Sequence, residues 1–318
     1  MRVLITGGAG RLGINVCQAF LQDGFQVRVL DLDTPRNRKS VRELGEKAEV
    51  MWGDVTQPEL VRRAIEGVDT VVHMAAILPP VAYEKPELAA RVNVGGTRVI
   101  VDLIKEKGGR IPLVYTSSVA VFGPTPGATE PISPDRNGPH PRGAYGETKL
   151  QAENLIKEAG IDHVILRLTA TMYLAFEVSD LKRMFSVPLN NRVEYCHPHD
   201  TATAILNAVK NFDAVNGSTL VISGGREQRM LYRDMIAAIL GVLGLPVPPA
   251  RKFTREPYYL DWYDTSKSQA LLRFQRKTFV DYLKDYSREL ARQYSPLFRP
   301  FMRRFVGPVF GKMVVQFM

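Results

Sequence analysis

Short apolar runs alternate with helix-like segments over the first half of the chain. Each run is rich in β-branched residues, and the segment after it carries apolar residues at helical spacing. This repeated strand-helix-strand order predicts an α/β fold with a doubly wound parallel sheet, in which a ligand binds at the carboxyl ends of the strands. The strands are expected at residues 3–6, 26–31, 49–55, 69–76 and 111–118, with two more at 162–168 and 219–223.

The first strand runs into a glycine-rich turn that opens a helix. Gly7, Gly10 and Gly13 follow the strand, and residues 14–21 show helical periodicity. Because glycine has no Cβ, the backbone can turn tightly there and approach a pyrophosphate, while the first amides of the helix donate hydrogen bonds. The pattern predicts a dinucleotide site in a Rossmann-type sheet.

Asp31 ends the second strand, roughly 20 residues beyond the glycines. Its carboxylate can accept hydrogen bonds from both adenosine ribose hydroxyls and would repel a 2′-phosphate, which favours NAD. Asp54, which ends the third strand, is expected to meet the adenine amino group. NADP stays open as the alternative, because nearby cations could neutralise an extra phosphate: Arg11, Arg36, Arg38 and Lys39.

The chain after the fifth strand departs from the regular alternation. We expect residues 1–170 to form the dinucleotide-binding domain and to carry the catalytic residues, with strands returning at about 190–225. A small C-terminal substrate-binding lobe is expected from residues 171–195 and 226–286. Two proline-rich stretches are expected to be ordered loops near the substrate side, namely 123–142 and 245–257.

The composition is that of a basic globular protein. The 318 residues are 45% hydrophobic, and 42 basic against 33 acidic residues give a net charge of +9. That charge favours anionic ligands, but no nucleic-acid motif accompanies it, so we expect no nucleic-acid partner. Cys17 and Cys196 indicate no disulfide framework. Met1 leads directly into the first strand and no apolar run is long enough to span a bilayer, so a cytoplasmic protein is expected.

Several sequence motifs over roughly residues 1–170 resemble those of the extended short-chain dehydrogenase/reductases and occur in the same order along the chain. This group includes sugar-nucleotide epimerases and dehydratases. The motifs occupy residues 6–13, 53–55, 73–76, 92–97, 116–123 and 145–149. The resemblance implies that Gly7, Gly10 and Gly13 are the cofactor glycines. Further cofactor contacts are expected from Arg11, Leu12, Asp31, Asp54, Val55, Ala75 and Ala76, and from Tyr145 and Lys149.

The same resemblance implies a reactive group of Ser118, Tyr145 and Lys149. Tyr145 and Lys149 stand four residues apart on a helix expected at 145–159, so both face one site. An ammonium beside the phenol, with the nicotinamide charge, would stabilise the phenolate and make Tyr145 an acid/base. Lys149 would also bind the nicotinamide ribose, and Ser118 would hold the substrate oxygen. Asn93 is counted as the fourth catalytic residue, because it matches the family's structural asparagine between helix and active site.

Two departures from the family pattern narrow the chemistry. Val119 and Ala120 stand where dehydratases carry an Asp-Glu pair, so elimination lacks its acid and base. Where sugar-nucleotide enzymes carry an Asn-x-Tyr-Gly-Pro segment, residues 166–176 lack this motif, and the chain there is rich in apolar side chains with few groups for a diphosphate. We therefore expect hydride transfer at a secondary alcohol or ketone of a small or fairly apolar substrate. The alternatives are a sugar or sugar-nucleotide epimerase, and a non-catalytic NAD(P)-binding sensor or RNA-binding protein that would commonly lack Tyr145 or Lys149.

The second half of the chain holds two further candidate features. Cys196, His197, His199 and Asp200 are potential metal ligands, but Asp200 directly precedes a helix-like segment, so we expect a helix cap and no metal. Residues 287–318 form a basic amphipathic segment that is expected to pack on the parent domain or on a second subunit. Contact with an anionic membrane is the alternative for this segment. Family habit suggests a homodimer.

Overall fold

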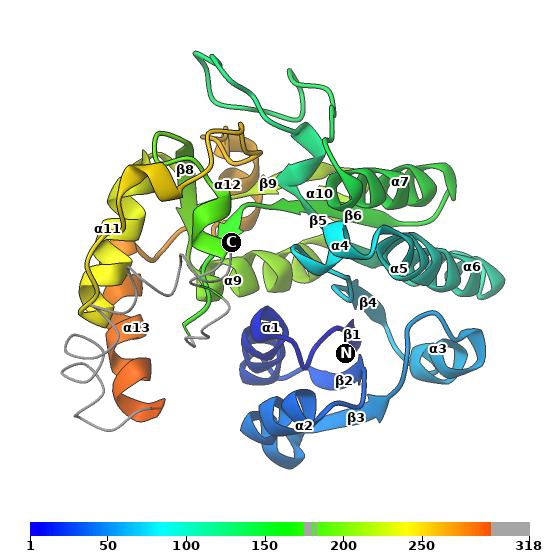
Figure 1. Cartoon of the computed structure of the whole chain (residues 1–318). Coiled ribbons are helices and arrows are strands. Elements are labelled where there is room, and N and C mark those ends of the chain that lie inside the picture. The colour runs from blue at the N-terminus through cyan, green and yellow to red at the C-terminus, as the bar shows by residue number, and fades with distance from the viewer. Residues whose placement is uncertain (175–179, 181–182, 294–318) are drawn as a thin grey trace.

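A seven-stranded parallel sheet in the order β3-β2-β1-β4-β5-β6-β9 forms the centre of the computed structural model (Figure 1). The structure describes residues 1–174, 180 and 183–293, so most of the basic C-terminal segment lies outside the described residues. The strands of this sheet are β1 (Arg2–Thr6), β2 (Gln26–Asp31), β3 (Ala48–Trp52), β4 (Thr70–His73), β5 (Leu113–Ser118), β6 (His163–Leu168) and β9 (Thr219–Ile222). The strand order reverses direction between β1 and β4, where α/β sheets bind their ligands.

Helices cover both faces of the sheet, so the predicted α/β fold class is confirmed. The described helices are α1 (Arg11–Gln22), α2 (Pro35–Val41), α3 (Pro58–Ile65), α4 (Val81–Glu84), α5 (Pro86–Ala89), α6 (Thr97–Glu106), α7 (Ala144–Glu158), α9 (Pro198–Lys210), α10 (Phe212–Val215), α11 (Tyr232–Leu243), α12 (Ser266–Leu272) and α13 (Phe279–Gln293).

The main strands begin and end close to their predicted positions. The third strand ends at Trp52 and the fourth at His73, so Asp54, Ala75 and Ala76 lie in the loops that follow them. The helical segment between β4 and β5 is not continuous. A π-helical stretch, Ala90–Gly96, separates α5 from α6.

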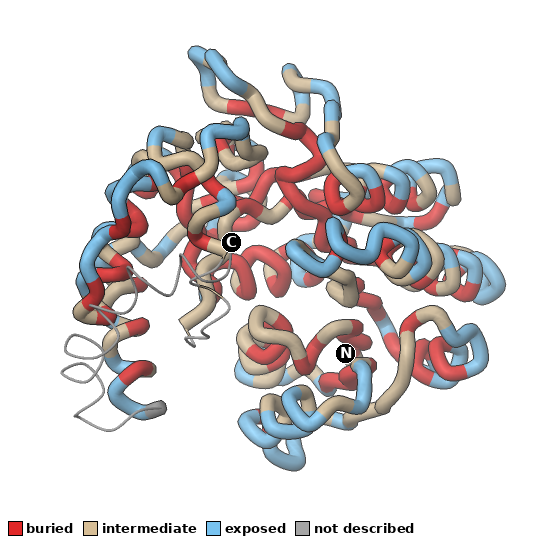
Figure 2. The backbone as a smooth tube through the Cα atoms, in the orientation of Figure 1, coloured by how far each residue is buried: buried red, intermediate tan, exposed pale blue. Residues whose placement is uncertain are grey.

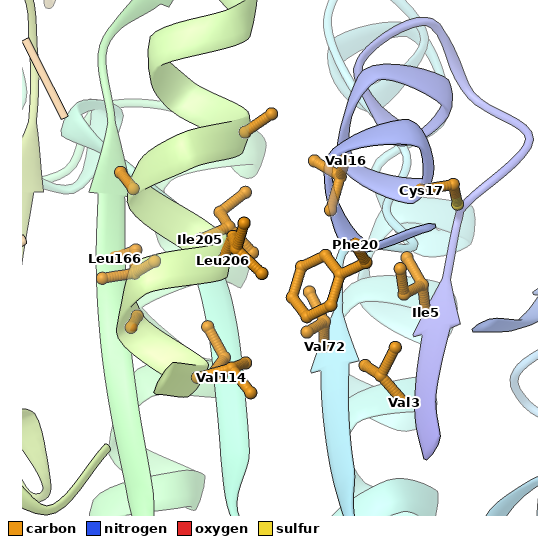
Figure 3. Close-up of a cluster of buried hydrophobic side chains, with 14 of the residues drawn as sticks. Val3, Ile5, Val16, Cys17, Phe20, Val72, Val114, Leu166, Ile205 and Leu206 are labelled. Atoms are coloured by element: carbon orange, nitrogen blue, oxygen red, sulfur yellow. The ribbon is translucent and has the colours of Figure 1, made fainter. Parts of the chain in front are cut away.

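Side chains of β1 alternate between two apolar clusters, because successive residues of a strand point to opposite faces. Val3 and Ile5 belong to the cluster under α1 and α9. Leu4 belongs to the cluster under α3 and α6. Figure 3 shows Phe20 of α1 pointing across the first cluster toward Ile205 of α9. The glycine turn between β1 and α1 is therefore held between two packed elements.

A second, three-stranded sheet has the order β10-β8-β7. Its strands are β7 (Ala170–Thr171), β8 (Arg192–Cys196) and β10 (Arg229–Leu231). Figure 2 shows buried stretches on α11 and α13, which share a separate apolar cluster with β8. The ring of Tyr195 lies 5.0 Å from that of Tyr282 and 5.3 Å from that of Phe279, between centroids. None of the described helices is both long and apolar enough to span a bilayer.

The start of α9 differs from the expectation. His197 is the N-cap, and its Nδ1 accepts the N–H of His199 at 3.1 Å. Asp200 lies in the first turn, where its Oδ2 accepts the N–H groups of Arg276 and Lys277 at 3.0 and 2.9 Å. The prediction that Asp200 caps this helix is wrong, because its carboxylate holds the loop before α13 instead.

His197, His199 and Asp285 bring three potential ligand atoms within 4.8 Å of one another. In neutral His197 the bond accepted by Nδ1 leaves the proton on Nε2, so Nε2 offers no lone pair to a cation. Nε2 lies 3.5 Å from Asp285, and Lys277 pairs with the same carboxylate at 3.3 Å. The Nδ1 bond and the contact with Asp285 favour a structural histidine at the start of α9 over a metal ligand.

Candidate active site

A cavity of about 660 Å³ follows the carboxyl ends of the parallel strands and extends to α11. It brings together the expected cofactor residues and three of the four expected catalytic residues. The members that line it are Gly7, Gly10, Arg11, Leu12, Gly13, Asp31, Asp54, Val55, Ala75, Ala76, Ser118, Tyr145 and Lys149. Neither proline-rich stretch, 123–142 or 245–257, contributes to the lining.

The glycine turn is packed against other backbone atoms. Gly7 has a φ of +73°, and a Cβ there would lie 2.8 Å from the Ala75 nitrogen. A Cβ on Gly13 would lie 2.3 Å from the Gly7 oxygen. No side chain caps α1, whose N-cap is Gly10, and its first turn contains no acidic residue. The positive end of this helix is thus suited to a pyrophosphate, so the residues present fit a dinucleotide.

Asp31 is oriented by its neighbours at the end of β2. Its Oδ2 accepts the Ala9 N–H at 2.9 Å, and its Oδ1 accepts the Leu32 N–H at 2.7 Å and the side-chain amide of Asn37 at 3.1 Å. Burial raises the pKa of Asp31, although the two backbone bonds oppose this shift. Asn37 also lines the cavity, although it was not predicted as a site residue. Arg38, one of the cations considered for NADP, pairs with Asp33.

Asp54 closes the turn after β3. Its Oδ1 accepts both the N–H and the hydroxyl of Thr56 at 2.9 Å. One carboxylate oxygen is therefore used within the turn, while the residue still lines the cavity. Its contact with an adenine amino group stays a prediction.

Arg11 connects the glycine turn to the segment after β7. Its guanidinium makes two bonds of 3.0 Å with Asp180 and lies over the ring of Tyr173, 4.1 Å from the centroid. Burial opposes ionisation of Asp180, but the bonds from Arg11 and Arg183 hold its pKa below the ordinary value. No local pattern could have revealed this contact, because Arg11 and Asp180 are 169 positions apart.

Tyr145 and Lys149 lie on the buried face of α7, with 7% and 2% of their surfaces exposed. Burial raises the pKa of Tyr145 above its ordinary value, and a hydrogen bond with Ser118 opposes the shift. The Lys149 ammonium donates to the carbonyl oxygen of Thr116 at 2.8 Å and to the hydroxyl of Tyr115 at 3.3 Å. Among the protein groups, desolvation therefore outweighs the polar neighbours of Tyr145. The acidic phenol, which was expected beside the nicotinamide charge, stays a prediction.

A buried ion pair lies behind the reactive group. Glu153 follows Lys149 by one helical turn and binds the Arg167 guanidinium at 2.7 and 2.9 Å. It also accepts the Ser117 hydroxyl at 2.6 Å. Burial lowers the pKa of Lys149 to about 7, and the charge of Glu153 opposes this shift. Glu153 thus stabilises the charged form of Lys149 and holds the Ser117 hydroxyl at the end of β5.

Asn93 has a positioning role. The side chain is buried in the π-helical stretch, where its Oδ1 accepts the Ile77 N–H at 2.7 Å. Its Nδ2 donates to the Ile77 oxygen and to the Thr148 hydroxyl, both at 3.1 Å. Asn93 does not line the cavity, so its side-chain hydrogen bonds reach the site through Ile77 and Thr148, and its place among the catalytic residues stays a prediction. It fastens the loop after β4 to α7, because one amide can both donate and accept.

The apolar part of the cavity lining was not predicted. One face of α11 lines the cavity, and its residues recur at the helical spacing that could have revealed it. They are Tyr232, Met235, Ile236, Ile239, Leu240 and Leu243.

The family model described as "NAD dependent epimerase/dehydratase family" matches residues 3–223. The chain belongs to this family. It is 32% identical over 185 residues to D-erythronate dehydrogenase of Cupriavidus necator, covering 53% of this chain and 54% of that protein. It is also 32% identical over 173 residues to a 3 beta-hydroxysteroid dehydrogenase/Delta 5-->4-isomerase of Mycobacterium tuberculosis, covering 52% of this chain and 44% of the relative. The chain spans about half the length of these curated relatives.

The fold is shared with solved structures over nearly the whole chain. UDP-glucuronic acid 4-epimerase of Bacillus cereus, in complex with UDP-glucuronic acid and NAD, superposes with a TM-score of 0.77. The alignment covers 92% of this chain and 100% of the epimerase at 20% identity. At that identity the match concerns the fold.

Proposed function

We propose that this protein is an NAD-dependent oxidoreductase that transfers a hydride between nicotinamide and a secondary alcohol or ketone of a fairly apolar substrate. The observation that carries the proposal is that Ser118, Tyr145 and Lys149 open into the same cavity as the glycine turn and Asp31. A phosphate cradle and a proton-transfer group thus share one space. Membership of the family and the dehydrogenase names of the two relatives support the same chemistry.

The residues proposed to bind the cofactor are distributed along the cavity. The N–H groups at the start of α1 would bind the pyrophosphate, and Asp31 would accept hydrogen bonds from the adenosine ribose hydroxyls. Ala75 and Ala76 are small, so the cofactor can pass close to the end of β4. When bound, NAD supplies the hydride acceptor or donor. Lys149 holds the nicotinamide ribose.

Tyr145 and Ser118 act on the substrate oxygen. Because burial raises the pKa of Tyr145, the phenol is protonated at neutral pH and can donate its proton to the oxygen of a ketone. The Ser118 hydroxyl donates to the same oxygen as negative charge develops. Oxidation of the alcohol uses the same contacts in reverse and requires the phenolate form of Tyr145, which accepts the hydroxyl proton as the hydride leaves the carbon and which becomes more populated as pH rises.

Two features of the lining support an apolar substrate that undergoes simple hydride transfer. Val119 and Ala120, which directly follow β5, have hydrocarbon side chains, so these positions supply no acid-base pair for elimination. Arg11 and Arg183 line the cavity and both pair with Asp180, whose single carboxylate offsets one of the two positive charges and holds both guanidinium groups. A diphosphate substrate would have to break these pairs.

The wild-type protein tests the reaction class and the cofactor together. With secondary alcohols and NAD we expect NADH to accumulate in a one-to-one ratio with the ketone. The dissociation constant for NAD should be at least about tenfold lower than for NADP, because Asp31 repels a 2′-phosphate and Arg38 is paired with Asp33. Absorbance at the NADH band and calorimetric titration measure both. Epimerisation of a sugar nucleotide without net NADH would instead support the epimerase alternative.

The pH profile tests the link between Glu153 and Lys149. The lowered Lys149 pKa of about 7 means that its charge is present below this pH and is lost as pH rises through it, so ketone reduction should decline there. Glu153→Gln removes a charge that raises this pKa, so we expect the decline in kcat/KM to move about one pH unit lower. Glu158→Gln, at an exposed position of the same helix, is the matched control. Superimposable profiles for wild type and Glu153→Gln would contradict the link.

A further inference from the structure

The cavity continues past the reactive group into an apolar space along α11, here called the α11 chamber. It is lined by Tyr232, Met235, Ile236, Ile239, Leu240 and Leu243, which belong to one buried cluster and are at most 8% exposed. Tyr282 and Tyr286 of α13 line the same cavity. The chamber is therefore a hollow next to the core of the C-terminal region and opens toward the cofactor cleft.

Two stacked tyrosines join the chamber to the reactive group. The rings of Tyr258 and Tyr259 lie 4.2 Å apart between centroids, and their hydroxyls are 3.0 Å apart. Tyr259 packs against the cluster that contains Tyr145. Tyr258 packs against the cluster that forms the chamber. A substrate held at Tyr145 can thus extend along this pair to α11.

Three tyrosine hydroxyl groups that line the cavity around the chamber donate hydrogen bonds within the protein. Tyr232 donates to the carbonyl oxygen of Met184 at 3.0 Å, and Tyr282 donates to that of Tyr173 at 3.2 Å. Tyr258 donates to the hydroxyl of its stacked neighbour. A sugar or phosphate in the chamber would lose its hydration without gaining these partners, which is costly, whereas a hydrocarbon gains from leaving water.

We propose that the α11 chamber binds the hydrocarbon body of the substrate, an elongated apolar molecule with its secondary alcohol or ketone near one end. The proposal rests on the proposed function, which places that oxygen at Tyr145. Met235 and Leu243 are eight residues apart on α11, which is about 12 Å of helix and matches an extended chain of roughly eight to ten carbons. The chamber thus selects substrates by hydrocarbon length.

A series of alkan-2-ols from butan-2-ol to dodecan-2-ol tests the proposal in the wild-type protein with NAD. We expect kcat/KM to rise by roughly fourfold for each added methylene until the chamber is filled, because each buried CH₂ contributes hydrophobic free energy. The increase should stop at roughly ten carbons. A kcat/KM that is independent of chain length would overturn the chamber assignment while leaving the oxidoreductase function in place.

A matched pair of variants on α11 tests whether the dependence of kcat/KM on chain length arises in the chamber. Leu240→Phe fills the chamber, and we expect the ratio of kcat/KM for decan-2-ol to that for butan-2-ol to fall at least about tenfold. Ala237→Phe makes a larger change on the exposed face of the same helix and should leave this ratio unchanged. Equal ratios in both variants, each with an unaltered melting temperature, would overturn the proposal.

A binding measurement separates the proposal from the reaction and does not depend on a folded variant. Decan-2-one should raise the melting temperature of the wild-type protein in the presence of NADH, whereas UDP-glucose should not. Stabilisation by decan-2-one without any turnover would support the chamber and contradict the proposed function. Stabilisation by UDP-glucose and none by decan-2-one would overturn the chamber.

Discussion

Replacing Tyr145 by phenylalanine should lower kcat by about 10³-fold, within the range that a positioned acid/base contributes. The substitution removes the phenolic hydroxyl but keeps the ring, which packs with Ala82, Ala89 and Ala120. The folded structure should therefore persist, and the dissociation constant for NAD should change far less than kcat. Steady-state rates of ketone reduction, together with titration of NAD, measure the two effects separately.

Tyr83→Phe provides the control for this substitution. Tyr83 lies on α4, is 43% exposed and does not line the cavity. Tyr83→Phe removes the same hydroxyl from a residue outside the cavity lining, so the kcat of this variant should remain close to that of the wild type. If Tyr145→Phe also retained wild-type turnover, proton transfer by Tyr145 would be ruled out.

Gly13→Ala should weaken NAD binding by about 10- to 100-fold and lower the free energy of unfolding by about 1–3 kcal/mol. The new Cβ would lie 2.3 Å from the Gly7 oxygen and 2.7 Å from backbone atoms of Gly8. These atoms cannot give way as the end of a flexible side chain would, so the turn itself must shift. Calorimetric titration with NAD and denaturant unfolding measure the two losses.

Gly241→Ala is the matched glycine substitution. A Cβ on Gly241 meets nothing within 4 Å, and the residue lies within α11. Alanine there should increase the free energy of unfolding by about 0.5–1 kcal/mol, because it is the better helix former, and should leave NAD affinity unchanged. NAD binding by Gly13→Ala as tight as that of Gly241→Ala would show that the turn does not contact the cofactor.

The main strands could be predicted from the sequence because each has a local signal. β2 was predicted at its observed bounds, since an apolar run ends in a single acid. The helical segment between β4 and β5 contains a π-helical stretch around Asn93, which no local pattern in the sequence indicates. The Asn93 side chain there bonds with Ile77 and Thr148, which lie on other parts of the chain.

Part of the candidate site was likewise predictable. The spacing of Tyr145 and Lys149 predicts that both side chains share one helix face, and both line the cavity. Their ionisation was not predictable, because it depends on how completely the surrounding elements exclude water. Burial raises the pKa of Tyr145 and lowers that of Lys149, and Glu153 opposes only the second shift.

By itself the sequence determined the α/β fold, the glycine turn at the end of β1 and the residue types of the reactive group, because these depend on patterns within a few tens of residues. The tertiary structure alone decided that Arg11 pairs with Asp180 and that Asp200 holds the loop before α13. It also decided that one face of α11 lines the same cavity as the reactive group. Such contacts join residues distant in the chain, and their geometry arises only when separate helices and strands pack together.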